Sequence, residues 1–348
     1  MNRHLPILLF ILSITLTDAT EFYGAGSFKS IGSSSRVIAL GNTMFSGIIS
    51  SENMLLNPAS IGNEHKVTFH GNMREGDDFF GEYNSFGFTY PFRKTLFTWG
   101  MNIINLNIDG LMEYDENGQW ISEFESSELY FDLNISSHRK KQAWGLKVSN
   151  FYNTMKGGEF QDYSFGLGVG YLVETELKKL SFTESGIDFE LKLLTQVGLN
   201  GERYFNAKEI TSSNYIPTQL RFGSNLVQLN FLNGSHKLQS KLLYDINWRN
   251  SYPLEYAWGF NTGYTFNNLI QINFNMGRDN NYFDSKKSEI LQIIELEELV
   301  STYSYGIDFI FMGNFLNIGQ GKKIAVSFSQ ITHPYFSKFH YVTLGLKL

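Results

Sequence analysis

Apolar and polar residues alternate with a period of two along most of the chain, from Val67 to the C-terminus. The clearest run is Leu129–Ser136, LYFDLNIS, in which every second residue is apolar and the others are polar or tyrosine. A period of two is that of a β-strand whose two faces meet different environments. The pattern recurs about 14 times, which predicts an all-β fold of about 14 antiparallel strands.

A closed barrel and a soluble sandwich both fit this alternation. The expected strands cover residues 67–72, 86–92, 97–103, 129–136, 144–148, 163–171, 187–199, 218–228, 238–248, 255–266, 270–277, 303–312, 323–330 and 338–348. A sandwich would bury its apolar face and need a partner sheet. An even number of strands can instead close into a transmembrane β-barrel, which leaves no unpaired edge in lipid. We expect the barrel, with its apolar side chains outside.

Composition and charge agree with this fold. The 348 residues include 31 Phe, 19 Tyr and 32 Gly, as expected for aromatic girdles and many turns. The mean hydropathy is -0.20, because lipid-facing and lumen-facing residues cancel in the average. Cysteine is absent, which excludes a disulfide scaffold and Cys-ligated metals. The formal net charge of -6 argues against a nucleic-acid partner.

The first 19 residues have the organisation of a secretory signal peptide. Arg3 and His4 precede an apolar run from Leu5 to Leu16, and Thr17–Ala19 matches a small-x-small cleavage pattern. A single membrane anchor is the alternative, but the run is shorter than the ~20 residues that a spanning helix needs. We expect export with cleavage near Ala19, and membrane crossing by strands alone.

The segment Ser33–Gly62 lacks the strand alternation. Apolar residues between Val37 and Ile49 recur at roughly helical spacing, and Asn57-Pro58 halts any helix. Because this segment precedes the barrel, we expect it to fill the lumen as a hatch, called the plug below. The expected organisation is a signal peptide at 1–19, a linker and hatch at 20–66, and a barrel at 67–348.

The connections between the expected strands alternate in length. Short ones occupy residues 92–95, 137–142 and 267–268, and long ones occupy 105–127, 200–217 and 278–302. Bacterial barrels have short periplasmic turns and longer outer loops, which assigns these two groups to opposite ends. Two connections on the short side, 173–186 and 313–321, are longer than this rule expects. Residues 286–300 have the apolar spacing of a short helix, which would cover the rim or act as a lid or docking surface.

We find no motif for catalysis or cofactor binding. The glycines of residues 166–170 run along a strand, whereas a phosphate loop turns from a strand into a helix. His65 and His70 lack a predicted third and fourth metal ligand. Asp115–Gly118 lacks the ligand ladder of a calcium loop, and no nucleophile elbow occurs. The sequence therefore predicts no enzyme, no cofactor and no metal site.

Several motifs occur in a specific order along the chain. They are Gly32, Ser35-Arg36, Ala39–Asn42 and, after a spacer, Asn57–Gly62, followed by Asp109–Gly118, Trp144–Val148 and Pro217–Gly223. Together they resemble the PorV and PorQ outer-membrane proteins, relatives of the FadL-type long-chain fatty-acid channels. The opening pattern of that family reads approximately G-x-x-x-R-x-x-x-M-G and then N-P-A-x-L. The chain departs from it at Ile38–Leu40, where the family often has Ala, Gly and Met.

The resemblance implies a FadL-like barrel in the outer membrane with an N-terminal hatch in its lumen. The implied hatch residues are Arg36, Gly41, Asn42, Asn57, Pro58 and Ala59. In the PorV and PorQ branch, the barrel serves the type IX secretion system and contacts translocon partners and exported substrates with sorting domains. In FadL-type members, a hydrophobic ligand enters beside the hatch. We expect an accessory or docking component of secretion, and the alternative is a channel for hydrophobic small molecules such as long-chain fatty acids.

Arg36 needs an acidic partner if it lies in the lumen. Asp132, Asp162 and Asp308 have inward parity and are the candidates. The alternative is that Arg36 faces periplasmic water.

The last strand has an apolar face that ends at the C-terminus. Its residues are Val342, Leu344, Leu346 and Leu348. This pattern resembles the C-terminal signal of outer-membrane barrels, although phenylalanine is the more usual last residue. We therefore expect outer-membrane lipid and the barrel-assembly machinery as partners.

Overall fold

The computed structural model describes residues 32–45, 50–75, 81–92, 96–114, 117–155, 160–184, 186–206, 218–249, 253–284, 297–316, 319, 321–332 and 338–348. The expected signal peptide, residues 1–19, lies outside these ranges. Three short helices come first in the described chain: α3 (Ser35–Ala39), α4 (Ser50–Asn53) and the 3-10 helix η1 (Pro58–Ile61). None of the described helices is long and apolar enough to span a bilayer.

Strands make up the remainder of the described secondary structure. The first eight are β1 (Thr68–Glu75), β2 (Glu82–Pro91), β3 (Phe97–Tyr114), β4 (Trp120–Arg139), β5 (Gln142–Met155), β6 (Phe160–Glu174), β7 (Lys178–Glu184) and β8 (Ile187–Asn206). The other seven are β9 (Gln219–Asn233), β10 (His236–Arg249), β11 (Glu255–Phe266), β12 (Ile270–Asp284), β13 (Glu297–Met312), β14 (Lys323–Thr332) and β15 (Phe339–Lys347).

The sheet closes on itself, because its first and last strands pair. The antiparallel register of β1 with β15 runs from Thr68↔Lys347 to Glu75↔His340. On the other side, β6 pairs with the second part of β8, and β7 pairs with the first part. Since β7 continues the path of β6 along β8, the ring is a closed antiparallel barrel of 14 strands. The predicted fold and strand number are confirmed.

The two faces of the wall have opposite chemistry. On the outside, apolar side chains such as Leu133, Phe274 and Leu344 are 45%, 58% and 52% exposed. On the inside, polar side chains such as Asn102 and Asp132 are buried. This is the reverse of a soluble protein, and it is the arrangement of a transmembrane barrel that faces lipid outside and encloses a polar lumen.

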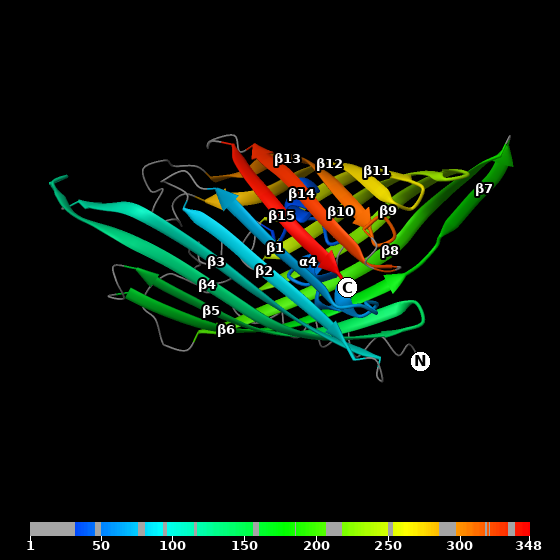
Figure 1. Cartoon of the computed structure of the whole chain (residues 1–348). Coiled ribbons are helices and arrows are strands. Elements are labelled where there is room, and N and C mark those ends of the chain that lie inside the picture. The colour runs from blue at the N-terminus through cyan, green and yellow to red at the C-terminus, as the bar shows by residue number, and fades with distance from the viewer. Residues whose placement is uncertain are drawn as a thin grey trace.

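The two ends of the barrel differ in their connections. At one end lie the short turns between β4 and β5, β9 and β10, and β11 and β12, together with the C-terminus. We call this the turn end. We call the opposite end, where the chain passes from β3 to β4, the loop end. Hairpins project from both: β3 and β4 at the loop end, and β7 and β8 at the turn end (Figure 1).

Several predicted connections are strand instead. Most of residues 105–127 belongs to β3 and β4, which stay paired as far as Tyr114↔Trp120. The connection 173–186 contains β7, so its length reflects a projecting hairpin rather than a loop. The predicted helix at 286–300 is wrong for Glu297–Val300, which begin β13, and its other residues lie outside the described ranges. In these hairpins the strands stay paired beyond the residues that alternate between apolar and polar side chains. Strands beyond the barrel rim do not face lipid, so they need no apolar face.

We predict that an arginine costs stability on the barrel exterior and not beyond the rim. Phe274 lies outside on β12, whereas Leu177, in the link between β6 and β7, is 75% exposed. Phe274→Arg should lower the free energy of unfolding by about 2–4 kcal/mol, and Leu177→Arg by at most about 1 kcal/mol. Urea titrations of the barrel folded in lipid vesicles measure both values. Equal losses would contradict the assignment of the exterior to lipid.

Candidate functional site

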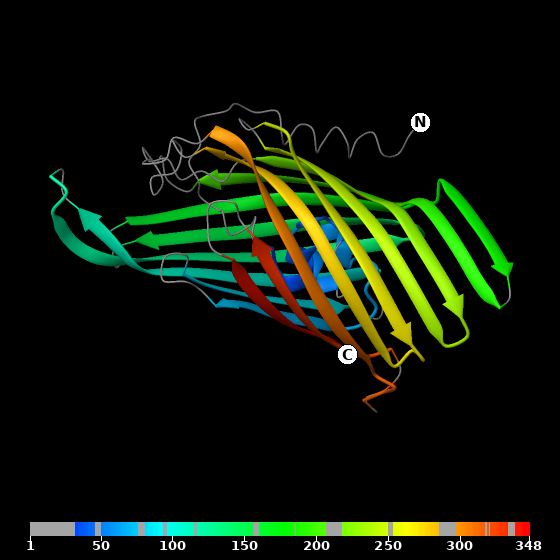
Figure 2. The same ribbon diagram turned by 90° about the horizontal axis from the view of Figure 1, so that it is seen from above.

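The described residues 32–45 and 50–66, which precede β1, lie inside the barrel and are called the plug from here on. Helix α3 contacts β12 to β15, α4 contacts β1 to β3, and η1 contacts β3 to β6. The plug therefore touches opposite sides of the wall, and it lies within the ring of strands when the barrel is viewed from above (Figure 2). Its helices therefore lie in the lumen, between the two sides of the barrel.

Local signals in the sequence set the shape of the plug. The hydroxyl of Ser34 accepts from the backbone N–H of Val37 at 3.3 Å and caps α3. The helix ends at Ala39, and Gly41 and Asn42, with φ angles of 63° and 57°, then reverse the chain. The Oδ1 atom of Asn57 accepts from the backbone N–H of Ala59 at 2.9 Å and caps η1.

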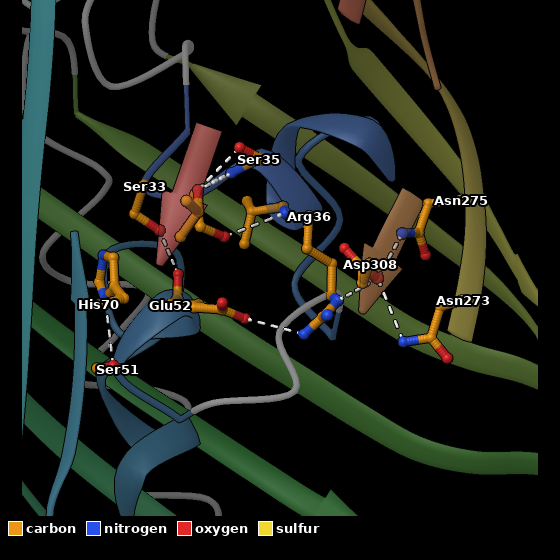
Figure 3. A network of polar contacts seen from close by, with 12 residues as sticks. Ser33, Ser35, Arg36, Ser51, Glu52, His70, Asn273, Asn275 and Asp308 are labelled. Carbon is orange, nitrogen blue, oxygen red and sulfur yellow. Dashed lines mark hydrogen bonds and ion pairs between the residues drawn. The ribbon is translucent and has the colours of Figure 1, made fainter. Parts of the chain in front are cut away.

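The guanidinium of Arg36 is the first anchor between plug and wall. Its Nε donates to Oδ2 of Asp308 on β13 at 2.8 Å, and its Nη1 lies 3.5 Å from Oε2 of Glu52 in α4. Asn273 and Asn275 of β12 donate to the same Asp308 oxygen, at 3.2 and 2.7 Å (Figure 3). Arg36 and both carboxylates are buried, so a dehydrated cation joins α3 to the wall and to α4.

The three predicted acidic partners of Arg36 have different surroundings. Asp308 holds Arg36 directly. Asp132 instead accepts from Asn102 at 3.2 Å and from Asn134, both on the neighbouring inward positions of β3 and β4. The side chain of Asp162 lies outside the described residues. Of the three candidates, Asp308 is the one that pairs with Arg36, and inward parity alone could not single it out.

A second anchor was missed by the sequence analysis. The ammonium of Lys147 on β5 donates to the carbonyl of Leu55 in the plug at 3.0 Å, and it pairs with Glu202 on β8. Glu202 also accepts from Tyr204 at 3.2 Å and Gln219 at 3.1 Å. The available signal was Lys147 itself, a charge at an inward position between two lipid-facing apolar residues.

A third anchor lies on β9 and β10 and was also missed. Oδ2 of Asp245 accepts from the backbone N–H of Met44 at 2.7 Å and from Nε of Arg221 at 2.8 Å. Arg221 donates in addition to the carbonyl of Asn42, and the Asn42 side chain donates to Asp279 at 3.3 Å. The turn that follows α3 is thus held by a charge pair of the wall.

The Asn57-Pro58 motif touches the wall backbone where the wall has glycine. The Nδ2 atom of Asn57 donates to the carbonyls of Tyr171 and Leu199 at 3.2 and 3.3 Å. A Cβ at Gly170 would lie 2.1 Å from Oδ1 of Asn57, and one at Gly145 would lie 2.5 Å from the Pro58 carbonyl carbon. These glycines are therefore close-packing positions. Ala59 lies in the same contact, and its carbonyl accepts from Ser136 at 3.4 Å.

An aromatic cluster fills the lumen between the plug and the loop end. Its members are the wall residues Tyr83, Ile104, Leu106, Tyr130, Phe151, Tyr204, Phe339 and Tyr341 and the plug residues Ile38 and Leu55, all at most 9% exposed. The rings of Tyr83 and Tyr341 meet edge to face at 6.4 Å. The sequence analysis did not identify this cluster. Its signal was an aromatic residue on the polar face of a strand, as Tyr130 is.

The predicted C-terminal signal lies on the outer surface. Val342, Leu344 and Leu348 are exposed, Leu346 is half-buried, and the backbone N–H of Leu348 donates to the Val67 carbonyl at 2.9 Å. Within the described ranges, no three His, Cys, Asp or Glu side chains are grouped to hold a metal ion.

Comparison with known proteins gives matches in structure only. No family model matches the sequence. No curated protein matches it either. One similar solved structure is the CymD monoaromatic hydrocarbon channel, with a TM-score of 0.50, 8% sequence identity and coverage of 91% of this chain and 97% of that one. Another is a deltaS2S3 mutant of the TodX monoaromatic hydrocarbon channel, with a TM-score of 0.52, 10% sequence identity and coverage of 91% of this chain and 97% of that one. The chain has the fold of a FadL-like barrel.

A Pseudomonas aeruginosa FadL homologue is also similar, with a TM-score of 0.46, 7% identity and coverage of 94% of this chain and 99% of that one. Neither of the two channels with TM-scores of at least 0.5 is described as a PorV or PorQ protein. The FadL-like part of the expected resemblance therefore stands, and the PorV/PorQ assignment has no support from these neighbours.

We predict that Asp308→Asn loosens the plug. Removing one partner of a buried ion pair costs about 3–5 kcal/mol, because the other charge stays buried. Hydrogen exchange of the α3 amides should become faster by more than about 100-fold, while exchange of the barrel strands stays unchanged. The control is Glu190→Gln, which breaks the partly exposed pair with Lys179 and should cost less than about 1 kcal/mol. Unchanged protection of α3 in the Asp308→Asn protein would contradict the anchor.

We predict that a single methyl group at Gly170 displaces the Asn57-Pro58 turn. Gly170→Ala should weaken plug docking by about 1–3 kcal/mol, because the wall backbone cannot retreat. Gly71→Ala is the matched control, since a Cβ at Gly71 meets no atom within 4 Å. Limited proteolysis of the plug should distinguish the two variants. Equal cleavage rates would mean that the close approach at Gly170 is not needed to hold the plug.

Proposed function

We propose that this protein is an outer-membrane channel for hydrophobic small molecules, with the plug closing its lumen. The observation that carries the proposal is the aromatic cluster. The inward face of the wall is otherwise polar and charged, yet six aromatic side chains gather between the plug and the loop end. A water-filled pore does not require a buried aromatic group. An apolar ligand, in contrast, is stabilised there by about 25 cal/mol of transfer free energy for each Å² of apolar surface that leaves water.

The fold and the ends of the barrel support this function. The similar structures with TM-scores of at least 0.5 are described as monoaromatic hydrocarbon channels. Short periplasmic turns and long outer loops are the rule for bacterial barrels, so we assign the loop end to the outside. A hydrophobic ligand from outside would then reach the aromatic cluster before it reaches the plug. No catalytic role is proposed.

The second candidate is an accessory role in type IX secretion. It rests on the resemblance of the N-terminal motifs to PorV and PorQ proteins, and the neighbours named above favour the channel instead. Purification of the barrel from solubilised outer membranes distinguishes the two functions. Co-purification of a translocon or of substrates with sorting domains would favour secretion.

The channel proposal predicts that one cluster residue controls uptake. Phe151 lies in the cluster at 1% exposure, whereas its neighbour Tyr152 faces outward at 37%. Cells that lack their own hydrophobic channels should take up toluene or a long-chain fatty acid faster when they make this protein. Phe151→Ser should reduce that gain by about tenfold, because the site loses a buried aromatic side chain worth about 1.5–3 kcal/mol.

Tyr152→Ser is the control and should leave uptake unchanged. Surface levels of both variants are compared by labelling of intact cells. No gain in uptake for either probe, or equal losses in the two variants, would contradict the channel.

A further inference from the structure

A carboxylate with one buried oxygen that has no partner in the described structure lies at the edge of the aromatic cluster. Glu128 of β4 shares the inward parity of Tyr130, and in the register it stands opposite Leu106 of β3 and Asn153 of β5. Its side chain is half-buried overall. Its Oε2 atom is fully buried and has no hydrogen-bond partner among the described residues. Leu106 and Tyr130 both belong to the cluster, so this carboxylate borders its loop-end side.

Asn153, which pairs with Glu128 in the sheet, also has a buried oxygen atom without a partner in the described structure. Asn153 is 8% exposed, and its Oδ1 atom is buried without a hydrogen-bond partner in the described structure. Directly opposed residues in an antiparallel pair have Cβ atoms about 4.5–5.5 Å apart. Two unsatisfied acceptors therefore stand side by side next to Phe151. An unsatisfied buried acceptor costs about 1–3 kcal/mol, so a ligand that donates to both would recover that cost.

The nearby cations of the described wall are held elsewhere. Lys147 pairs with Glu202 and donates to Leu55. Arg74 donates to the carbonyl of Gly81 at 2.9 Å and lies over the ring of Phe339. Both cations therefore have other partners within the described residues, which leaves the buried Oε2 atom of Glu128 open to a donor from a ligand.

The hairpin of β3 and β4, on which Glu128 lies, is acidic. The sequence from Leu96 to His138, which includes the projecting hairpin of β3 and β4, contains no Lys or Arg. Its acids are Asp109, Glu113, Asp115, Glu116, Glu123, Glu125, Glu128 and Asp132. A region of one charge sign concentrates ligands of the opposite sign and repels those of the same sign. The hairpin thus favours cations over anions at the entrance.

We propose that Glu128 and Asn153 bind the ammonium group of a hydrophobic amine whose apolar body packs on the aromatic cluster. A primary ammonium has three donors, of which two satisfy the Glu128 carboxylate and the Asn153 amide oxygen. The rings of Tyr130 and Phe151 add the attraction of aromatic faces for a cation. This inference rests on the proposed function, because it names the ligand class of the same lumen.

Three probes of equal chain length test the proposal: n-octylamine, n-octanol and octanoate. Each is titrated by calorimetry into the full-length mature barrel in nanodiscs of zwitterionic lipid, and the signal of empty nanodiscs is subtracted. The wild type should bind octylamine about tenfold more tightly than octanol, which is the contribution of a charge-assisted hydrogen bond, and octanoate most weakly. Glu128→Gln should remove most of this preference and leave octanol binding unchanged.

Glu125→Gln is the matched control. Glu125 is an exposed acid on the same strand with outward parity, so its loss should leave the preference for octylamine intact. Asn153→Ala should weaken octylamine binding about threefold and spare octanol.

Each possible result decides between the two proposals. Octanol binding without a preference for octylamine, or a preference that survives in Glu128→Gln, would overturn the amine site and leave the channel standing. Failure of all three probes to bind would overturn both. Retained octanol binding in Glu128→Gln shows in the same experiment that this variant is folded.

Discussion

The pairing of β1 with β15 is the interaction on which the rest of the structure depends. In lipid, no water can replace a missing backbone partner, so a sheet that crosses a bilayer has to close. The register from Thr68↔Lys347 to Glu75↔His340 provides that closure. A ring of about eight strands is filled by its own side chains, whereas a ring of 14 strands encloses more space than they can fill. The width set by closure is therefore the reason that the lumen holds a plug.

The alternation of the wall then decides how the plug is held. Because apolar side chains face outward, most inward positions are polar, so much of the contact between plug and wall is polar. Arg36 with Asp308, Lys147 with Leu55, and Asp245 with Met44 hold it at three separate places. A buried ion pair penalises every arrangement that leaves one of its charges buried without a partner. Anchors on three parts of the wall therefore specify a single orientation of the plug.

The sequence predicted the features that follow from the alternation of apolar and polar residues along each strand. It did not predict which residues meet across the lumen. Alternation predicted the strands, their number and the closed barrel, since one exposed apolar face is repeated in every strand. The inward parity of Asp308 made it one of three candidate partners for Arg36. The pair of Lys147 and Glu202 was not foreseen, because it joins residues 55 positions apart on β5 and β8. Strand ends were misjudged where hairpins leave the barrel, since the lipid-facing pattern stops there.

The number of anchors also limits how far the plug can move. If separating each of the three buried anchors costs about 2 kcal/mol, complete ejection of the plug costs about 6 kcal/mol. At about 1.4 kcal/mol for each factor of ten, an ejected plug would be populated less than about once in 10⁴ molecules. Movement of one part of the plug breaks fewer contacts. The turn at Asn57 and Pro58 rests on glycine backbone and on hydrogen bonds of a neutral amide, so it can shift while Arg36 stays paired with Asp308. A movement of this turn therefore breaks fewer charged contacts than one that expels α3, which carries Arg36.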